Sequence, residues 1–274
     1  MGADAALQEA ILRWYDAHAR DLPWRRTRDP YAILVSEFML QQTQVARVIP
    51  RYQAWLERWP DAAALAGAAR ADVLRAWVGL GYNRRAIRLH ECAQVVARDG
   101  WPADAAGLRA LPGVGPYTAA AVATFAFDEP VAAVDVNHER VVARATGLVD
   151  ARPRELAARA AALVPPDRAA AWNHALMDLG ATICRARSAD CDACPAAAVC
   201  ASAGRVQIPP RRAKGSPAPK FEDTDRYVRG RVVAALAGGA PLPVEVGEER
   251  LERALAGLER DGLIVREDGR VRLP

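Results

Sequence analysis

Apolar residues recur at intervals of three and four along most of the first 200 residues, the spacing that places them on one face of a helix. The N-terminal stretch shows this with Leu7, Ile11, Leu12 and Tyr15, which are separated by acids and arginines. No alternating polar and apolar run is long enough to propose a sheet, and glycine or proline repeatedly interrupts the pattern. This part is therefore expected to be all-α, with helices over residues 5–20, 31–40, 45–59, 62–67, 71–78, 83–99, 103–110, 115–126, 136–146, 153–164 and 168–179.

The pattern changes after the first 207 residues. Residues 208–220 are rich in proline, glycine and basic side chains, a composition typical of a linker. Residues 221–274 predict two helices, over 224–236 and 248–261, and two strands, over 263–266 and 270–273. The dipeptide at 268–269 is Asp-Gly, which favours a hairpin. We therefore expect a small winged-helix-like α+β module, which either docks on DNA or protein or packs as an appendage.

A chain of 274 residues is long enough for about two domains, each with its own core. The N-terminal 20 residues carry acids and arginines throughout an amphipathic pattern, so they resemble neither a signal peptide nor a membrane span. We expect a cytoplasmic protein without a membrane partner.

The formal net charge is +4, and nearly all basic side chains are arginines. Lysine occurs only at Lys214 and Lys220, so the first 213 residues contain no side-chain amine that could form a Schiff base. A covalent mechanism through lysine is thereby excluded for that part of the chain.

Four cysteines, Cys184, Cys191, Cys194 and Cys200, lie within seventeen residues in the spacing C-x6-C-x2-C-x5-C. Only one close C-x2-C pair is present and all four thiols share one short loop, which favours a cubane iron-sulfur cluster over structural zinc. Zinc and a disulfide pair are the alternatives, the disulfide being disfavoured because nothing upstream indicates export. The fifth cysteine, Cys92, falls in a helical pattern and is expected to be a buried structural thiol.

Residues 111–119 read LPGVGPYTA, which places Gly113 and Gly115 in a tight turn directly before an alanine-rich helix. Backbone N–H groups at such a turn bind anions, and without lysine or a Walker sequence the expected anion is a nucleic-acid phosphate. An ordinary loop between two helices is the alternative. Further along, Asp135 lies in VAAVDVNH, and a carboxylate framed by apolar residues is costly unless it has a use.

Together these elements resemble the helix-hairpin-helix base-excision glycosylase superfamily, and in particular its adenine-specific, MutY-type branch. The resemblance covers residues 5–205 approximately, and any one of its motifs is weak, whereas all seven in order are highly specific. The motifs are LPWR at 22–25, SEFMLQQTQV at 36–45, GLGY at 79–82, LPGVG at 111–115, VDVN at 134–137, NHALMDLG at 173–180 and the cysteine spacing.

The resemblance implies a mainly α, two-lobed glycosylase region over residues 1–207. Its six-helix lobe would span residues 22–128, and its cluster lobe residues 1–21 and 129–207, with a 4Fe-4S cluster on the four cysteines. It also implies a monofunctional enzyme that removes adenine mispaired with 8-oxoguanine or guanine during base excision repair. The partner is then double-stranded DNA containing a mispaired adenine, and the protein is expected to be a nucleoid-associated monomer.

Cleaving an N-glycosidic bond resembles glycoside hydrolysis, in which one carboxylic acid protonates the leaving group and a second carboxylate stabilises an oxocarbenium-like sugar. By similarity, Glu37 delivers a proton to N7 of the flipped adenine and Asp135 faces the cation that develops at C1′. Burial of Glu37 between apolar helices would raise its pKa and keep it protonated near neutrality. The structural alternatives are a solvated helix acid for Glu37 and a helix N-cap for Asp135.

Tyr117 distinguishes base hydrolysis from strand cutting. Bifunctional relatives resembling endonuclease III carry lysine at this position and attack C1′ with it, and a phenol cannot form that imine. We therefore expect hydrolysis by water, with Tyr117 ordering the site and Asn137 orienting Asp135 or the water.

Base flipping needs side chains that fill the vacated stack, and Gln42 and Tyr82 match the residues that the family inserts. A core tyrosine and exposed glutamines are the plainer interpretations. Arginines at 84, 85 and 88 are candidates for phosphate contacts, and those at 226, 229 and 231 are expected to add sequence-independent affinity for DNA. The predicted DNA-binding residues are Trp24 and Arg26 at the adenine pocket, Gln41, Gln42, Thr43, Leu80 and Tyr82 at the lesion, and Arg84, Gly113, Gly115 and Thr118 at the backbone.

The chain departs from the family pattern at Asn83, Val136 and His174, where MutY-type enzymes commonly have tyrosine, glycine and glutamine. No part of these 274 residues resembles the long Nudix-like domain that usually recognises 8-oxoguanine, and we expect residues 221–274 to stand in its place. A thymine or uracil glycosylase acting on G:T or G:U mismatches is therefore the alternative, although QQTQ at 41–44 favours the adenine branch. A non-catalytic DNA-damage sensor is a further alternative, which the presence of both acids disfavours.

Overall fold

The computed structural model describes residues 2–206, 208, 220–267 and 269–274. Its chain forms two compact units, each of which gathers segments that are distant in sequence. Unit 1 contains Met1–Ile33, Pro102–Ala110 and Val114–Arg212, and unit 2 contains Leu34–Trp101, Leu111–Gly113 and Ala213–Pro274. Among the described residues, no helix is both long and apolar enough to cross a membrane.

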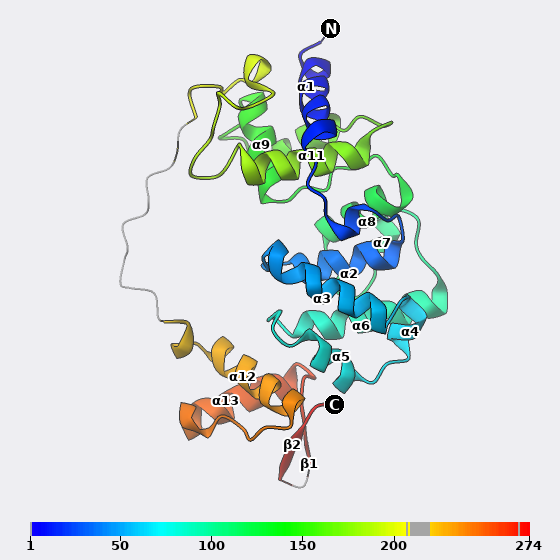
Figure 1. Ribbon diagram of the computed structural model, residues 1–274, viewed down its shortest axis with the longest axis vertical. Helices are drawn as coiled ribbons and strands as arrows, with labels where there is room; N and C mark the ends of the chain where they lie inside the picture. The colour runs from blue at the N-terminus through cyan, green and yellow to red at the C-terminus, as the bar shows by residue number, and fades with distance from the viewer. Residues whose placement is uncertain (1, 207, 209–219, 268) are drawn as a thin grey trace. The chain divides into compact units, whose positions relative to one another are not determined.

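Unit 1 is helical, and its core forms where α1 and α9 pack on α11 (Figure 1). Side chains such as Ile11, Val142 and Trp172 are fully or almost fully buried there. The cysteine loop follows α11, and Ala196 and three of its cysteines contact this core. The helices of unit 1 are α1 (Ala3–His18), α7 (Ala105–Leu108), α8 (Pro116–Phe127), α9 (Val136–Thr146), α10 (Pro153–Ala162) and α11 (Ala169–Thr182), with 3₁₀ turns η1 (Pro23–Arg25) and η2 (Ala197–Val199).

Unit 2 contains most of α2, which begins at the end of unit 1, and a group of helices around Trp55 and Trp77. The two indole rings meet edge to face with their centroids 5.5 Å apart, a favoured aromatic geometry. α6 packs against both α4 and α5 (Figure 1). The helices of this part are α2 (Pro30–Leu40), α3 (Val45–Arg58), α4 (Ala62–Ala66), α5 (Arg70–Trp77) and α6 (Arg84–Asp99).

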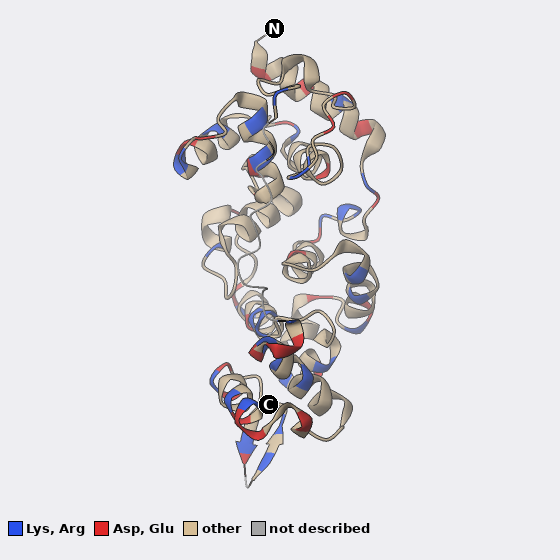
Figure 2. Ribbon diagram, turned by 90° about the vertical axis from the view of Figure 1, so that its left-hand side faces the viewer, with Lys and Arg blue, Asp and Glu red and all other residues tan. Residues whose placement is uncertain are grey.

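The C-terminal segment, residues 220–274, belongs to unit 2 and consists of two helices and a hairpin. The strands are antiparallel, with Val265 opposite Arg272 and Glu267 opposite Arg270. Figure 2 shows basic and acidic residues interspersed along these elements. The elements are η3 (Phe221–Asp223), α12 (Asp225–Gly238), η4 (Val244–Val246), α13 (Glu248–Arg260), β1 (Val265–Glu267) and β2 (Arg270–Arg272).

The structure confirms the predicted fold class, a mainly α chain with a small C-terminal α+β part. All thirteen predicted helices and both predicted strands are present, with ends that differ from the prediction by at most three residues. The four 3₁₀ turns among the described residues were not predicted, because three residues are too few to show a period. Most of the predicted linker and Asp268 of the hairpin lie outside the described residues, and the two predicted lobes stay a prediction.

Candidate active site

Glu37 lies on α2 in unit 2, and only 6% of its surface is exposed. The helix is buried on all sides, since residues 31–39 are all buried, and most of them are apolar. The prediction that Glu37 is a buried acid is therefore confirmed, and the solvated helix acid is excluded. The other three predicted catalytic residues, Tyr117, Asp135 and Asn137, lie in unit 1.

Asp135 is the N-cap of α9. Its Oδ1 accepts hydrogen bonds from the backbone N–H groups of Asn137 at 2.9 Å and His138 at 2.7 Å. Its Oδ2 accepts a third bond, at 3.0 Å, from the side-chain Nδ2 of Asn137. The three donors fix the orientation of this carboxylate at the N-terminus of the helix. The capping alternative is thus correct, and it coexists with a half-buried carboxylate held in one orientation.

Asn137 is held in turn by Arg140, whose Nη2 donates to Asn137 Oδ1 at 2.8 Å and to the carbonyl of Gly180 at 2.7 Å. The predicted role of Asn137 in orienting Asp135 fits this chain of hydrogen bonds. Gly180 lets α11 approach, because a Cβ there would lie 2.6 Å from the Cβ of Asn137. Sequence reasoning missed Arg140, since an arginine at the fifth position of a helix carries no signal of its own.

The two glycines of the predicted anion site belong to different units. Gly113 belongs to unit 2 and has φ of +76°, and a Cβ there would lie 2.6 Å from the Cβ of Arg88. Gly115 is the N-cap of α8 in unit 1, with Pro116 in the first turn. Tyr117 is half-buried, and Thr118 is buried, so its predicted contact would involve its backbone N–H rather than its hydroxyl.

The predicted lesion-side residues lie on two neighbouring turns of unit 2. Gln42 and Tyr82 have φ of +55° and +45°, and Asp128 is the only other non-glycine residue with positive φ in the described chain. Such backbone is strained for a side chain with a Cβ, and it occurs disproportionately at functional positions. Thr43 links the two turns, because its hydroxyl donates to the carbonyls of Gln41 at 3.3 Å and Leu80 at 3.4 Å.

Arg85 holds these turns together, and its expected phosphate contact is wrong. The residue is 9% exposed, and its guanidinium donates to the carbonyls of Phe38 and Gln41 at 2.6 and 2.7 Å. It also donates to the carbonyls of Leu80 and Gly81, both at 3.0 Å. Burial lowers the pKa of Arg85 to about 10, which leaves it charged at neutral pH.

The flanking arginines differ from Arg85. Arg84 is exposed, with its Nη1 3.7 Å from a carboxylate oxygen of Asp261, and Arg88 pairs with Glu91 at 2.9 Å. The sequence could not separate the three, because only burial distinguishes them.

Trp24 and Arg26 belong to the η1 region of unit 1. Trp24 is buried, whereas Arg26 is on the surface and forms an ion pair with Asp21. The residue between them, which the sequence did not single out, makes the stronger contact: Arg25 donates two hydrogen bonds, at 2.7 and 2.8 Å, to the buried carboxylate of Asp178. Burial acts to raise the pKa of Asp178, but the contacts with Arg25 and those with Arg20 together lower it below its ordinary value.

His174 stacks on Phe125, with ring centroids 4.0 Å apart. Burial, followed by the positive charges of Arg25 and Arg20, lowers its pKa to about 3 against the effect of Asp178. The ring is therefore neutral at physiological pH, which agrees with a structural histidine.

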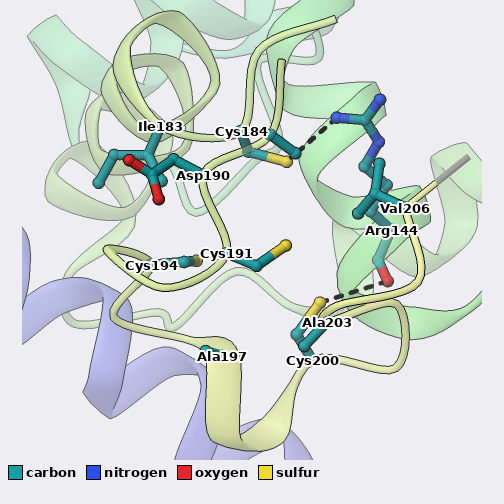
Figure 3. A pocket seen from close by; sticks show the side chains of 11 residues that line it. Arg144, Ile183, Cys184, Asp190, Cys191, Cys194, Ala197, Cys200, Ala203 and Val206 are labelled. Carbon is teal, nitrogen blue, oxygen red and sulfur yellow. Dashed lines mark hydrogen bonds between the residues drawn. The ribbon is translucent and has the colours of Figure 1, made fainter. Parts of the chain in front are cut away.

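Four half-buried, unpaired cysteines line one pocket beside the C-terminal part of α9 (Figure 3). The sulfurs of Cys184, Cys191 and Cys200 face a common space in that view. Arg144 supports the loop, because its Nη1 donates to Cys184 Sγ at 3.5 Å and to the carbonyl of Arg185 at 2.9 Å. Arg144, like Arg140 and Arg25, received no role from the sequence.

The cysteine pocket suits a cationic group bound by thiolates. Burial raises the pKa of Cys194 and of Cys200, and the negative charges of neighbouring cysteines raise both further. A positively charged centre would offset this repulsion. Within the described residues, no three His, Cys, Asp or Glu side chains are arranged to hold a single metal ion.

Cys92 differs from these four. It is fully buried on α6, and burial raises its pKa to about 12. The predicted structural thiol is confirmed.

Comparison with known proteins shows which family has this sequence and fold. Residues 35–166 match the family described as "HhH-GPD superfamily base excision DNA repair protein". A curated relative from Mycobacterium tuberculosis, named adenine DNA glycosylase, is 46% identical over 96% of this chain and 92% of its own. A relative of the same name from Mycolicibacterium smegmatis is also 46% identical, over 96% of this chain and 94% of its own.

A solved structure entitled as a thermostable thymine-DNA glycosylase aligns with a TM-score of 0.70 and 31% identity, and the alignment covers 74% of this chain and 98% of the other. The chain therefore belongs to the HhH-GPD superfamily of base excision DNA repair proteins, and within it to the family of the adenine DNA glycosylases.

Proposed function

We propose that the protein hydrolyses the N-glycosidic bond of adenine mispaired with 8-oxoguanine or guanine in double-stranded DNA. The observation that carries this proposal is a pair of carboxyl groups in unlike surroundings. Glu37 lies in an apolar helix, whereas Asp135 accepts three hydrogen bonds at a helix N-terminus. Glycosidic bond cleavage uses two carboxyl groups with different tasks, one as proton donor and one as charge stabiliser, and this pair fits that requirement.

Each acid then has one task. Glu37 protonates N7 of the flipped adenine, so that the base leaves as a neutral molecule. Asp135 stays ionised, faces the cation at C1′ and stabilises it electrostatically, while Asn137 and Arg140 keep its carboxylate in place.

We propose that the enzyme has no lyase activity through a lysine. Tyr117 stands at the hairpin position where the nucleophilic lysine would be needed, and no lysine precedes Lys214. Water is then the attacking group, and the abasic strand stays intact until it meets alkali or heat.

The four cysteines Cys184, Cys191, Cys194 and Cys200 would hold a 4Fe-4S cluster. Their shared pocket, their free thiols and the hydrogen bond from Arg144 to Cys184 all suit such a group. The cluster would supply structural support, because hydrolysis transfers no electron. The four cysteines would order the loop that carries Arg185 and Arg187, both of which are exposed.

On DNA, the strained residues Gln42 and Tyr82 would fill the space left by the flipped adenine and separate its partner base. Arg84 and the backbone groups of Gly113, Gly115 and Thr118 would contact phosphates. The second candidate function is removal of thymine or uracil from G:T or G:U mismatches, since the solved structure with 31% identity is entitled a thymine-DNA glycosylase.

A panel of duplexes separates these functions. Duplexes containing A:8-oxoG, A:G, G:T and G:U are each incubated with the protein and then treated with alkali. We expect strand breaks at adenine in the first two duplexes, only after alkali, and none in the others. Breaks at G:T or G:U would favour the alternative, and binding without any break would indicate a non-catalytic sensor.

Borohydride reduction during the same reaction tests the lysine argument. A Schiff base between the protein and the abasic sugar would be reduced to a stable adduct. We expect no adduct on an internal residue, and trapping by the Lys214→Ala/Lys220→Ala variant at such a residue would contradict the assignment.

A further inference from the structure

Tyr82 combines an exposed side chain with a strained backbone. It follows Gly79 and Gly81, whose φ angles are +96° and +71°, and its own φ is +45°. The residue is 42% exposed, so burial alone does not fix its ring. An aromatic side chain that must enter a base stack needs another means of orientation.

Two guanidinium groups contact the Tyr82 ring. The Cζ of Arg85 lies 5.6 Å from the ring centroid, and the Cζ of Arg226 lies 5.3 Å from it, both within cation–π range. Arg226 Nη1 also donates a hydrogen bond of 2.5 Å to the Tyr82 hydroxyl. Arg85 comes from the same α6 region, whereas Arg226 comes from α12, 144 residues away along the chain.

The start of α12 holds Arg226 in place. Thr224 caps the helix by accepting a bond from the N–H of Tyr227 at 3.3 Å. Phe221 contacts Tyr227 edge to face at 5.6 Å, and the Arg226 guanidinium lies over the Phe221 ring at 5.1 Å. The guanidinium is thus also held by Phe221 of η3, in addition to its contacts with Tyr82.

Its neighbours on α12 behave differently. Arg229 forms an ion pair with Asp261, and Arg231 donates to Glu245 at 2.6 Å. Within the described part of the chain, Arg226 pairs with no carboxylate, and its contacts are aromatic. Arg226 and Tyr82 also line the same pocket of unit 2, about 1040 Å³ in volume, which contains Gln42 as well.

We propose that Arg226 is a positioning residue for Tyr82, through which the C-terminal segment sets the preference for mismatched over undamaged DNA. This inference rests on the proposed function, because it assumes that Tyr82 enters the DNA at a mismatch. It also changes our expectation from the sequence, which gave residues 226, 229 and 231 one common role as phosphate contacts. Two of the three already have carboxylate partners.

A double-mutant cycle tests the proposal. Dissociation constants of Arg226→Ala, Tyr82→Ala and the double variant are measured with an A:8-oxoG duplex and with an undamaged duplex, all in an Asp135→Asn background that slows excision. We expect Arg226→Ala to lower the lesion preference about tenfold, which is about 1.4 kcal/mol, and to add nothing to Tyr82→Ala.

Two further variants separate positioning from charge. Arg226→Lys keeps the positive charge but loses the planar group that lies over the rings, so it should lose lesion preference as Arg226→Ala does. Arg272→Ala is the matched control, since Arg272 is an exposed arginine of the same segment that pairs with Glu267 outside the pocket. It should leave the preference unchanged.

A phosphate contact would give a different result. Arg226→Ala would then weaken binding to both duplexes equally, and its effect would add to that of Tyr82→Ala. It would also lower the slope of log affinity against log salt concentration by about one, while Arg226→Lys would bind as the wild type. That result overturns the inference and leaves the proposed function intact. If the wild-type protein shows no preference for A:8-oxoG, both fail.

Discussion

At the scale of single residues, Asp135 has two separable roles, as the cap of α9 and as the proposed charge at C1′. Asparagine can accept the same two backbone hydrogen bonds but carries no charge. We expect Asp135→Asn to change the melting temperature little and to lower the single-turnover excision rate about a hundredfold or more. Asp135→Ala should lose both functions. Excision near the wild-type rate by Asp135→Asn would remove the residue from the mechanism.

His174 makes stability depend on pH. Its pKa is lowered to about 3 in the folded chain, mainly by burial, whereas the unfolded value is about 6.5. Between these values the unfolded chain binds a proton that the folded chain does not. The contribution of the neutral, buried His174 to the unfolding free energy is therefore complete above pH 6.5. It decreases as the pH falls, by about 2 kcal/mol at pH 5.

The variant His174→Gln tests this linkage, because glutamine is common at this position in the family and does not titrate. We expect its unfolding free energy, from urea titrations at pH 5 and pH 7.5, to fall less between the two conditions than that of the wild type. If the unfolding free energies of the variant and the wild type fell equally between pH 7.5 and pH 5, another group would control the acid sensitivity.

At the scale of elements, Arg85 joins the end of α2 to the turn before α6. Its removal would delete charge-assisted hydrogen bonds to the carbonyls of Phe38, Gln41 and Leu80, each worth about 1.5–3 kcal/mol. We expect Arg85→Ala to lower the unfolding free energy by at least about 3 kcal/mol and to reduce lesion binding, because the strained turns at Gln42 and Tyr82 lose their common support.

Arg88→Ala is the control for that change. Arg88 lies on the same helix, is exposed and forms only a surface pair with Glu91, so its loss should cost less than about 1 kcal/mol. If the two variants were equally stable in urea, the assignment of Arg85 as the link between these elements would be wrong.

At the scale of the whole molecule, the cysteine loop connects metal content with fold. Purified protein should be yellow-brown and contain about four iron atoms per chain. We expect Cys194→Ser to lose iron and visible absorbance, to melt at a lower temperature and to bind DNA less tightly. Cys92→Ser should retain its iron, since that thiol is buried on α6, apart from the loop. A colourless wild-type protein with one zinc would contradict the cluster.

Much of the fold followed from the sequence because the signals are local. Periodic apolar residues defined the helices, and an Asp at 135 with apolar neighbours marked both a cap and a candidate carboxylate. The motif at 36–45 identified Glu37, and its neighbours alone implied burial. The C-x6-C-x2-C-x5-C spacing brings the thiols together on one short loop. No long-range contact was therefore needed to predict that the four cysteines share one site.

Only the tertiary structure decided the roles of the arginines. Arg85, Arg140, Arg144 and Arg226 look alike in the sequence, and each acquires its function from carbonyl, amide, thiol or aromatic groups that lie three to 144 residues away. The same holds for Gly180, whose missing Cβ matters because α9 crosses it. A side chain that reaches several atoms in any direction is specified by what surrounds it, and those surroundings exist only once distant segments have packed.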